Sequence, residues 1–382
     1  MQSIALLEKL LSFPTISRDS NLALIEFIQS YLQSYGISSQ LIHNDEQTKA
    51  NLYAVIGPRN KSGVMLSGHT DVVPVSGQIW SHDPFTMREE DGLLYGRGSA
   101  DMKGFIACAL AMVAAIDTDR LITPLHLAFS YDEEVGCIGV RRLLDMLSHS
   151  AVKPKFCIVG EPTCMQPVVA HKGKTAGRVC CTGVECHSSL APQGLNAIYL
   201  ATDMITAFRE IQEKIILQGC HDDEYDVTHT TVHVGVIEGG TALNIVPNHC
   251  EFKFEIRHLP EDQPEEFVAE LRQRAATIVA GHQQEFPAAN ITVTIDNSYP
   301  ALSTPTDSEV VQFVTELSGA NRTGKVTFGT EGGLFSEQLN IPTIVMGPGN
   351  IQQAHKPDEY IALSEIQRCD DFLGRLANAL YR

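Results

Sequence analysis

Residues 64–71 read VMLSGHTD, an apolar run that leads directly into a histidine and an aspartate. Short apolar runs of this kind are typical of strands that are buried on both faces of a sheet. Three later runs lead into polar segments in the same way: 125–130 into YDEE, 156–159 into GEPT, and 343–346 into GPGN with His355 beyond it. Because helical patterns alternate with these runs, as at 104–115 and 140–147, we predict an α/β fold whose mixed sheet is covered by helices.

The pattern changes after residue 173, where segments rich in valine and threonine replace the α/β alternation. Strands are predicted at 175–186, 227–237, 251–257 and 291–295, with amphipathic helices around 201–215 and 264–280. The α/β pattern resumes after Tyr299-Pro300. We therefore predict one discontinuous domain at 1–174 and 291–382, with a smaller α+β domain inserted at 175–290.

The composition is that of a soluble globular protein. The chain has 382 residues, 43% hydrophobic and 19% charged, which excludes a disordered or membrane-spanning chain. The length suggests two domains, or one large domain with an insertion. The formal charge is 28 − 46 = −18, which argues against nucleic acids and anionic membranes as partners. Small molecules are the expected ligands. No targeting segment is recognised at the start, so the cytoplasm is the expected location.

The ten cysteines show no paired C-x-x-C spacing and are predicted to be reduced. A zinc site made of Cys180, Cys181, Cys186 and His187 is conceivable. It is disfavoured because adjacent residues of a strand point to opposite faces of the sheet.

The polar residues that follow the predicted strands are expected to meet in one crevice, because ligands bind outside the carboxyl ends of strands in open α/β sheets. Asp101 joins this set from the segment GRGSADMKG at 96–104, just before a helix. Converging carboxylates would repel one another unless cations lay between them. Histidine and carboxylate ligands without a thiolate suit two zinc ions, and also cobalt or manganese. A carboxylate such as Asp101 can bridge two such ions.

Each of these residues alone has an ordinary explanation. His69 alone would suit a core histidine, Asp71 a turn cap, and Glu133-Glu134 a solvated pair at a strand end. Glu161 precedes a proline and would suit a turn. Their placement at successive strand ends favours a shared site.

Five segments together resemble the M20 family of metallopeptidases and deacylases: SGHTDVVP at 67–74, GRGSADMKG at 96–104, DEE at 132–134, GEPT at 160–163 and AHKPDEY at 354–360. They occur in the order found in the family, and the resemblance covers essentially the whole chain. Within the family, the segments AHKG at 170–173, IRHLP at 256–260 and GPGNI at 347–351 are most similar to the acetylornithine deacetylase branch. The family fold implied is zinc-peptidase-like, with an inserted ferredoxin-like domain that acts as a lid and in dimerisation.

The resemblance implies a role for each matching residue. Two divalent metal ions would be bridged by Asp101, and the remaining ligands would be His69 and Glu161 on one ion, and Glu134 and His355 on the other. Glu133 would be the general acid and base that moves the proton between water and the departing amine. Asp71 would orient His69. A cis peptide is implied at Asp101-Met102.

Three residues of the predicted insert and one loop residue match further family positions. His187 would reach the oxyanion, in dimeric members from the partner subunit, although Cys186 replaces the glycine usual before it. Arg257 would bind a substrate carboxylate, with a surface salt bridge as the alternative. Asn244 is a second substrate-binding position or a turn residue. Glu331 would meet a cationic amine, or is a solvated loop carboxylate.

The activity implied is hydrolysis of N2-acetyl-L-ornithine to L-ornithine and acetate, a step of arginine biosynthesis, by a homodimer. Succinyl-diaminopimelate desuccinylase, another N-acyl-amino-acid deacylase or an M20 peptidase are alternatives with the same metal residues. A non-catalytic metal-binding module is disfavoured, because it would not need Glu133 as an additional carboxylate beside the ligands.

Overall fold

The structure is a computed structural model that describes all residues, 1–382. The chain divides into two compact units. Unit 1 contains residues 1–170, 302–325 and 330–382, and unit 2 contains residues 171–301 and 326–329. None of the helices combines the length and the apolar character that crossing a membrane requires.

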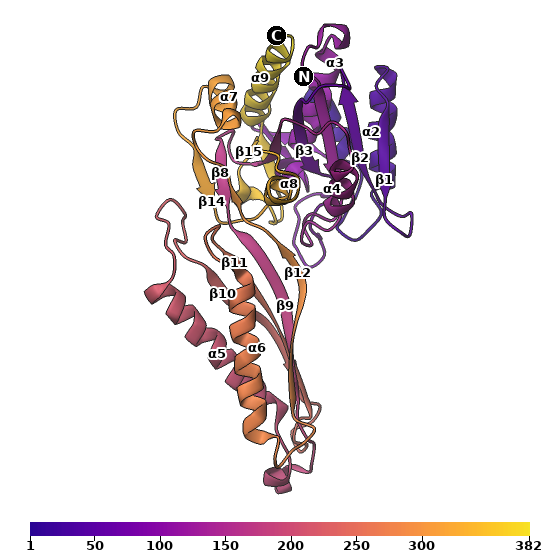
Figure 1. Ribbon diagram of the computed structural model, residues 1–382. Coiled ribbons are helices and arrows are strands. Elements are labelled where there is room, and N and C mark those ends of the chain that lie inside the picture. The colour runs from indigo at the N-terminus through magenta and orange to yellow at the C-terminus, as the bar shows by residue number, and fades with distance from the viewer. The chain divides into compact units, whose positions relative to one another are not determined.

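Unit 1 is built on a nine-stranded mixed sheet (Figure 1). Its strands are β1 (Ser39–His43), β2 (Ala50–Ile56), β3 (Val64–His69), β6 (Leu125–Ser130), β7 (Phe156–Pro162), β8 (Val168–His171), β13 (Leu302–Ser303), β14 (Gly324–Val326) and β15 (Thr343–Gly347). The order is β1-β2-β6-β3-β7-β15-β8-β13, with β14 paired to β8. The four central strands β6, β3, β7 and β15 are parallel, so their carboxyl ends meet at one edge.

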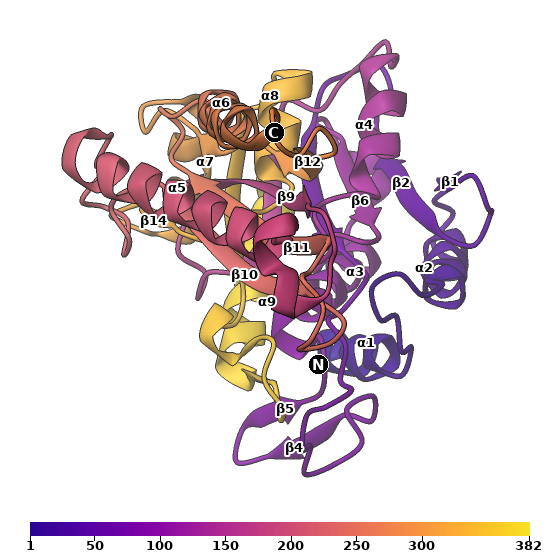
Figure 2. The same cartoon turned by 90° about the horizontal axis from the view of Figure 1, so that it is seen from below.

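Helices cover both faces of this sheet (Figure 2). They are α1 (Gln2–Leu11), α2 (Leu22–Ser34), α3 (Gly104–Ala115), α4 (Val140–Ser148), α7 (Glu309–Ser318), α8 (Gly332–Leu339) and α9 (Leu363–Leu380). Helix α3 packs between α1 and α9, and α4 packs against α8 on the other side. Because it has neighbours on several sides, α3 is apolar nearly all round, with the sequence GFIACALAMVAA. The mixed α/β fold expected from the sequence is therefore confirmed.

A small three-stranded sheet also belongs to unit 1. It consists of β4 (Arg88–Glu90), β5 (Leu93–Tyr95) and β16 (Tyr360–Ala362), in the order β16-β5-β4. This pairing joins the segment before Asp101 to the segment after His355, although the two are far apart in the sequence.

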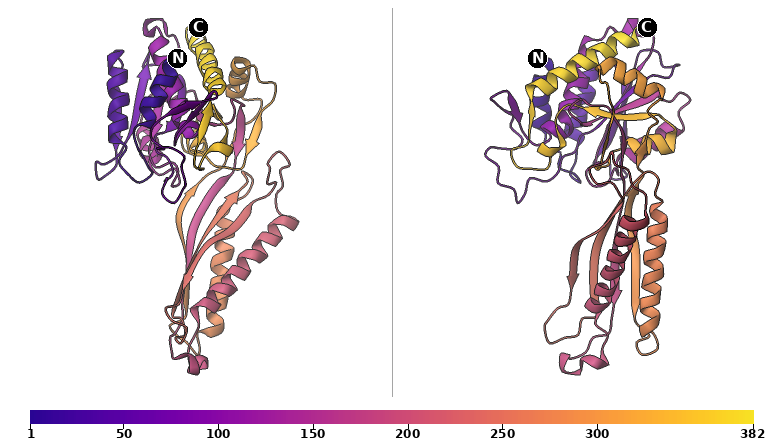
Figure 3. Two further views of the ribbon diagram at one scale, coloured as in Figure 1. Left: turned by 180° about the vertical axis from the view of Figure 1, so that it is seen from behind. Right: turned by 90° about the vertical axis from the view of Figure 1, so that its left-hand side faces the viewer.

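Unit 2 follows the order strand, helix, strand, strand, helix, strand. Its elements are β9 (Gly173–Thr182), α5 (Ala197–Gln218), β10 (Thr231–Gly239), β11 (His249–His258), α6 (Pro264–His282) and β12 (Asn290–Tyr299). The strands form an antiparallel sheet in the order β10-β11-β9-β12, which is the ferredoxin-like arrangement. Both helices lie on one face of the sheet (Figure 3), where Phe208 of α5 packs edge-on against Phe252 and Phe254 of β11.

The structure moves one predicted boundary. The sequence-based limit at residue 290 assigned residues 291–299 to the discontinuous domain, but these residues form most of β12. Strand β12 pairs with β9 from Asn290↔Thr182 to Tyr299↔Lys174, so it completes the sheet of unit 2. The limit between the units therefore lies near Ala301.

Candidate metal centre

The carboxyl edge of the central sheet carries most of the predicted ligands. His69 is the last residue of β3, Glu161 lies near the end of β7, and Glu134 follows the end of β6. His355 comes after β15 and the short helix η4 (Ile351–Gln353). Asp101 lies in the irregular helical turn η1 (Ser99–Lys103), which leads into α3. The structure brings these five side chains together within unit 1.

Asp101 stands between the two histidines. Its Oδ1 lies 3.0 Å from Nε2 of His69, and its Oδ2 lies 3.3 Å from Nε2 of His355. Glu161 Oε1 is 3.7 Å from His69 Nε2, and Glu134 Oε1 is 3.1 Å from His355 Nε2. Each oxygen of Asp101 therefore faces a separate group of ligand atoms, as a carboxylate that bridges two ions would.

The hydrogen bonding of His69 indicates which ring nitrogen is available to an ion. Nδ1 lies 2.9 Å from the backbone carbonyl oxygen of Asp71. Because a carbonyl only accepts, Nδ1 carries the hydrogen, and in the neutral ring Nε2 then holds a lone pair. That lone pair faces oxygens of Asp101 and Glu161. Such an arrangement is repulsive unless a proton or a cation lies between the atoms, so the donor set fits a divalent ion.

The electrostatics of the cluster lead to the same conclusion. Burial is the main cause that raises the pKa of Glu133 to about 8 and that of Glu134 to about 7. Burial and the charge of Asp101 raise the pKa of Glu161 well above its usual value. Hydrogen bonds to Asp101 and Glu134 raise the pKa of His355 to about 10. Without bound ions, the side chains of the cluster thus retain protons near neutral pH, and divalent cations can take the place of those protons.

The carboxylate of Asp71 lies beside His69 and also contacts two other segments. Its Oδ1 lies 3.6 Å from His69 Nδ1, and the backbone carbonyl of Asp71 is the nearer partner of that ring. The carboxylate also accepts hydrogen bonds from Ser17 Oγ at 2.7 Å and from the backbone N–H groups of Glu133 at 3.1 Å and Glu134 at 3.3 Å. Asp71 therefore fixes the loop that carries both glutamates to the end of β3.

The turn around Asp101 is held by a buried ion pair that the sequence analysis did not single out. Glu359 accepts hydrogen bonds from the backbone N–H groups of Ala100 and Asp101, at 3.0 and 3.1 Å. Its other oxygen lies 2.7 Å from Arg97 Nη1, and both side chains are 1% exposed. The Asp101-Met102 peptide is cis, as the family resemblance implies. Glu359 is part of the quoted segment 354–360, but nothing in that segment indicated its partner.

Glu133 and Glu331 lie at the same end of unit 1. Glu133 is half-buried, and its Oε1 accepts a hydrogen bond from Cys137 Sγ at 3.2 Å. Glu331 is the residue before α8 and is buried, so it is not a solvated loop carboxylate. Its Oε2 lies 3.5 Å from Ser67 Oγ, whereas its Oε1 has no hydrogen-bond partner. Burial raises the pKa of Glu331 to about 7.

The remaining predicted residues belong to unit 2. His187 is exposed, and its Nδ1 accepts hydrogen bonds from the Ser189 backbone N–H at 3.2 Å and from Ser189 Oγ at 2.8 Å. The hydrogen of the neutral ring is therefore on Nε2, which is the donor an oxyanion needs. Asn244 lies beside it, because the Ser188 N–H donates to the Asn244 carbonyl at 3.0 Å. Arg257 Nε donates a hydrogen bond to a carboxylate oxygen of Glu255 at 2.9 Å. This contact is a salt bridge, the alternative to substrate binding that the sequence left open for Arg257.

Comparison with known proteins identifies the family. The model of peptidase family M20/M25/M40 matches residues 65–379. A curated acetylornithine deacetylase of Proteus mirabilis is 34% identical over 380 residues, with 98% of this chain and 95% of the relative covered. One of Myxococcus xanthus is 35% identical over 376 residues, with 97% and 95% covered.

The solved structures agree on the fold. An M20 family metallo-carboxypeptidase of Sulfolobus solfataricus superposes with a TM-score of 0.79 at 19% identity, over 100% of this chain and 99% of that one. The five clustered side chains all lie within the segment that the family model matches. The chain therefore belongs to peptidase family M20/M25/M40 and is a metal-dependent amide hydrolase of that family.

Proposed function

We propose that the protein removes the acetyl group from N2-acetyl-L-ornithine to give L-ornithine and acetate, a cytoplasmic step of arginine biosynthesis. The observation that carries this proposal is the 34–35% identity to curated acetylornithine deacetylases over at least 97% of the chain. The solved M20 structure cited for the fold is far more distant in sequence, at 19% identity.

The proposed cofactor is a pair of divalent ions, with zinc the first choice and cobalt or manganese acceptable to the same ligands. His69 and Glu161 would hold one ion, Glu134 and His355 the other, and Asp101 would contribute one oxygen to each. The distances around Asp101 support this division, because its two oxygens face different histidines. When bound, such ions acidify a water molecule and polarise the amide carbonyl.

Glu133 is the proposed proton carrier of the reaction. As the water oxygen bonds to the acetyl carbon, the Glu133 carboxylate takes the proton that the water loses. When the carbon–nitrogen bond breaks, Glu133 returns that proton to the amine of ornithine. The acetic acid formed loses the second proton of the water, which the basic amine takes up, so the products are ornithine and acetate. Its position supports this role, because the carboxylate is half-buried, is held by Cys137, and lies within 4.8 Å of His69 and Glu161 ligand atoms.

The arrangement of unit 2 supports a homodimer. Arg257 pairs with Lys174 at the start of β9, whereas His187 follows Thr182, the last residue of β9. Eight residues of strand span roughly 26 Å at about 3.3 Å per residue. One small substrate therefore cannot touch both side chains of the same chain. If Arg257 and His187 both serve one reaction centre, a second copy supplies one of them.

Strand β10 offers a surface for that second copy. It is an edge strand whose only partner is β11, and Val236 and Ile237 are 47% and 49% exposed. An open edge with exposed apolar residues is prone to pair with another strand. We therefore place the proposed dimer contact on unit 2.

A substrate panel tests the proposed activity. Metal-reconstituted protein would be assayed for kcat/KM on N2-acetyl-ornithine, on succinyl-diaminopimelate, on other N-acyl amino acids and on dipeptides. The proposal predicts the highest value for N2-acetyl-ornithine. A faster cleavage of any other member would assign the substrate to that class instead, and no turnover of any amide would contradict the proposal altogether.

A further inference from the structure

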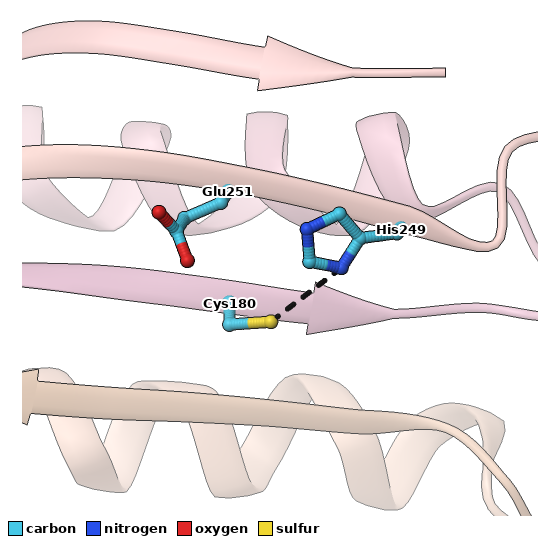
Figure 4. Close-up of side chains that lie close together, drawn as sticks. All are labelled: Cys180, His249 and Glu251. Carbon is cyan, nitrogen blue, oxygen red and sulfur yellow. Dashed lines mark hydrogen bonds between the residues drawn. The ribbon is translucent and has the colours of Figure 1, made fainter. Parts of the chain in front are cut away.

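A second group of metal-binding side chains lies in unit 2, outside the candidate metal centre. It consists of Cys180 on β9 and of His249 and Glu251 on β11, and we call it the Cys180 cluster (Figure 4). The neighbouring residues Cys181 and Cys250 point into the core beneath α5 and α6. Because successive residues of a strand point to opposite faces, the Cys180 cluster lies on the face of the sheet that these helices leave open.

The strand register explains why the three side chains meet. Cys180 is directly opposite Glu251, and His249 is opposite Thr182, two residues further along β9. His249 is therefore the diagonal neighbour of Cys180, within reach of a long or aromatic side chain. A thiol, an imidazole and a carboxylate consequently converge from two paired strands that hold one another in place.

The distances within the cluster suit a zinc ion. Cys180 Sγ lies 3.6 Å from His249 Nδ1. With a Zn–S bond of about 2.3 Å and a Zn–N bond of about 2.1 Å, a tetrahedral zinc holds its sulfur and nitrogen ligands roughly 3.6 Å apart. All three ligand atoms lie within 4.8 Å of one another, which is close enough for the three side chains to bind one ion.

The surroundings of the cluster carry both charges, because Arg178 and Lys253 are the next residues on the same face of the two strands. Glu238 of β10 is opposite Glu251 in the register, and Glu185 lines the same pocket of about 470 Å³ beside His249. These carboxylates favour the approach of a cation, and the pocket that His249 and Glu251 line gives water access to them as a fourth ligand. Burial and the charge of Glu251 raise the pKa of the Cys180 thiol. A bound ion therefore has to displace that proton.

We propose that Cys180, His249 and Glu251 form a separate site for zinc or another thiophilic divalent ion. On binding, the Cys180 thiol releases its proton to solvent and the thiolate bonds to the ion. The bound ion links β9 to β11 on the open face of the sheet, so it stabilises unit 2. None of its ligands belongs to the set proposed for the amide hydrolase, and the site is independent of the identity of the substrate.

Cobalt titration of the full-length protein tests the site, because a thiolate bound to Co²⁺ gives a sulfur-to-cobalt charge-transfer absorption that histidine and carboxylate ligands do not give. The ligand set proposed in unit 1 contains no thiolate. We expect this absorption in the unaltered protein and its loss in Cys180→Ser. Elemental analysis after zinc loading should find one ion fewer per chain in Cys180→Ser and in His249→Gln, while deacylation activity is unchanged.

Two control variants separate the site from general effects of substitution. Cys220→Ser removes an exposed cysteine of unit 2, and His233→Gln removes an exposed histidine of β10. Both should keep the cobalt absorption and the full metal count. The proposal is overturned if the absorption is absent from the unaltered protein, if it survives in Cys180→Ser, or if His249→Gln keeps the full metal count. In the first case the contact is only a thiol–imidazole hydrogen bond.

Discussion

Substitution of Glu133 by glutamine separates proton transfer from metal binding. The amide keeps the shape of the carboxylate and still accepts the hydrogen bond that Cys137 Sγ makes at 3.2 Å. It cannot take up a proton from water, so the general acid and base is lost. Such a group contributes about 10²- to 10⁴-fold to the rate, equivalent to about 3–5 kcal/mol of activation free energy. We expect kcat to fall by that factor with KM nearly unchanged, and both proposed ions to remain bound.

Glu134→Gln is the matched comparison, because Glu134 is the adjacent residue and lies 3.1 Å from His355 Nε2. This variant should lose metal as well as activity. Turnover would be followed by amine release, and bound metal by elemental analysis of the same samples. A Glu133→Gln variant that keeps more than about a tenth of the normal kcat would contradict the role of Glu133, because the loss of a general base should lower the rate at least about 100-fold. A Glu133→Gln variant that loses an ion would contradict it as well, since the Glu133 carboxylate would then be a ligand beside His69 and Glu161.

Three further outcomes are expected. Glu359→Gln leaves Arg97 charged and buried without its anionic partner. The free energy of unfolding, measured with denaturant, should therefore fall by about 3–5 kcal/mol, and a decrease of less than about 1 kcal/mol would contradict the role of this pair. Asp71→Asn weakens the hydrogen bonds that hold the backbone of the two glutamates to the end of β3. The metal affinity, measured with a competing chelator, should therefore fall about 10- to 100-fold. An unchanged affinity would contradict the positioning role of Asp71. Burial lowers the pKa of His126 to about 4, below the value of about 6.5 in the unfolded chain. The unfolded chain therefore binds the extra proton between these values. The contribution of the neutral His126 ring to the free energy of unfolding is complete above pH 6.5, and it falls by roughly 3 kcal/mol as the pH decreases to 4. His126→Asn should lack that part of the pH dependence in urea unfolding, and an unaltered slope would refute the assignment.

The fold was predictable where local pattern and tertiary structure agree. The run at 64–69 is apolar because β3 is buried on both faces between β6 and β7, and its end delivers His69 to the edge of the sheet. The prediction was less accurate where pairing partners are distant. The strand predicted over 175–186 ends at Thr182, and Val184 pairs instead with Leu195 in an isolated antiparallel bridge. That contact depends on a segment the local pattern does not include.

The candidate site was predictable in its residues but not in its supports. The proposed ligands were recognisable from motifs at strand ends, and the structure brings them together. Ser17 gave no such signal, because its hydroxyl meets Asp71 only through the tertiary fold. Glu359 was visible in a motif, yet its contact with Arg97 joins residues 262 positions apart. The Cys180 cluster was missed for the same reason, since only the register of β9 and β11 places Glu251 opposite Cys180.

The central claim is that one carboxylate, Asp101, lies between two ions held by His69 and Glu161 on one side and by Glu134 and His355 on the other. A crystal structure of the zinc-loaded protein, with the ions located by anomalous scattering, measures this directly. We expect two peaks in unit 1 about 3.5–4 Å apart, each in contact with one oxygen of Asp101. A single peak in unit 1, or two peaks of which only one contacts Asp101, would contradict the claim.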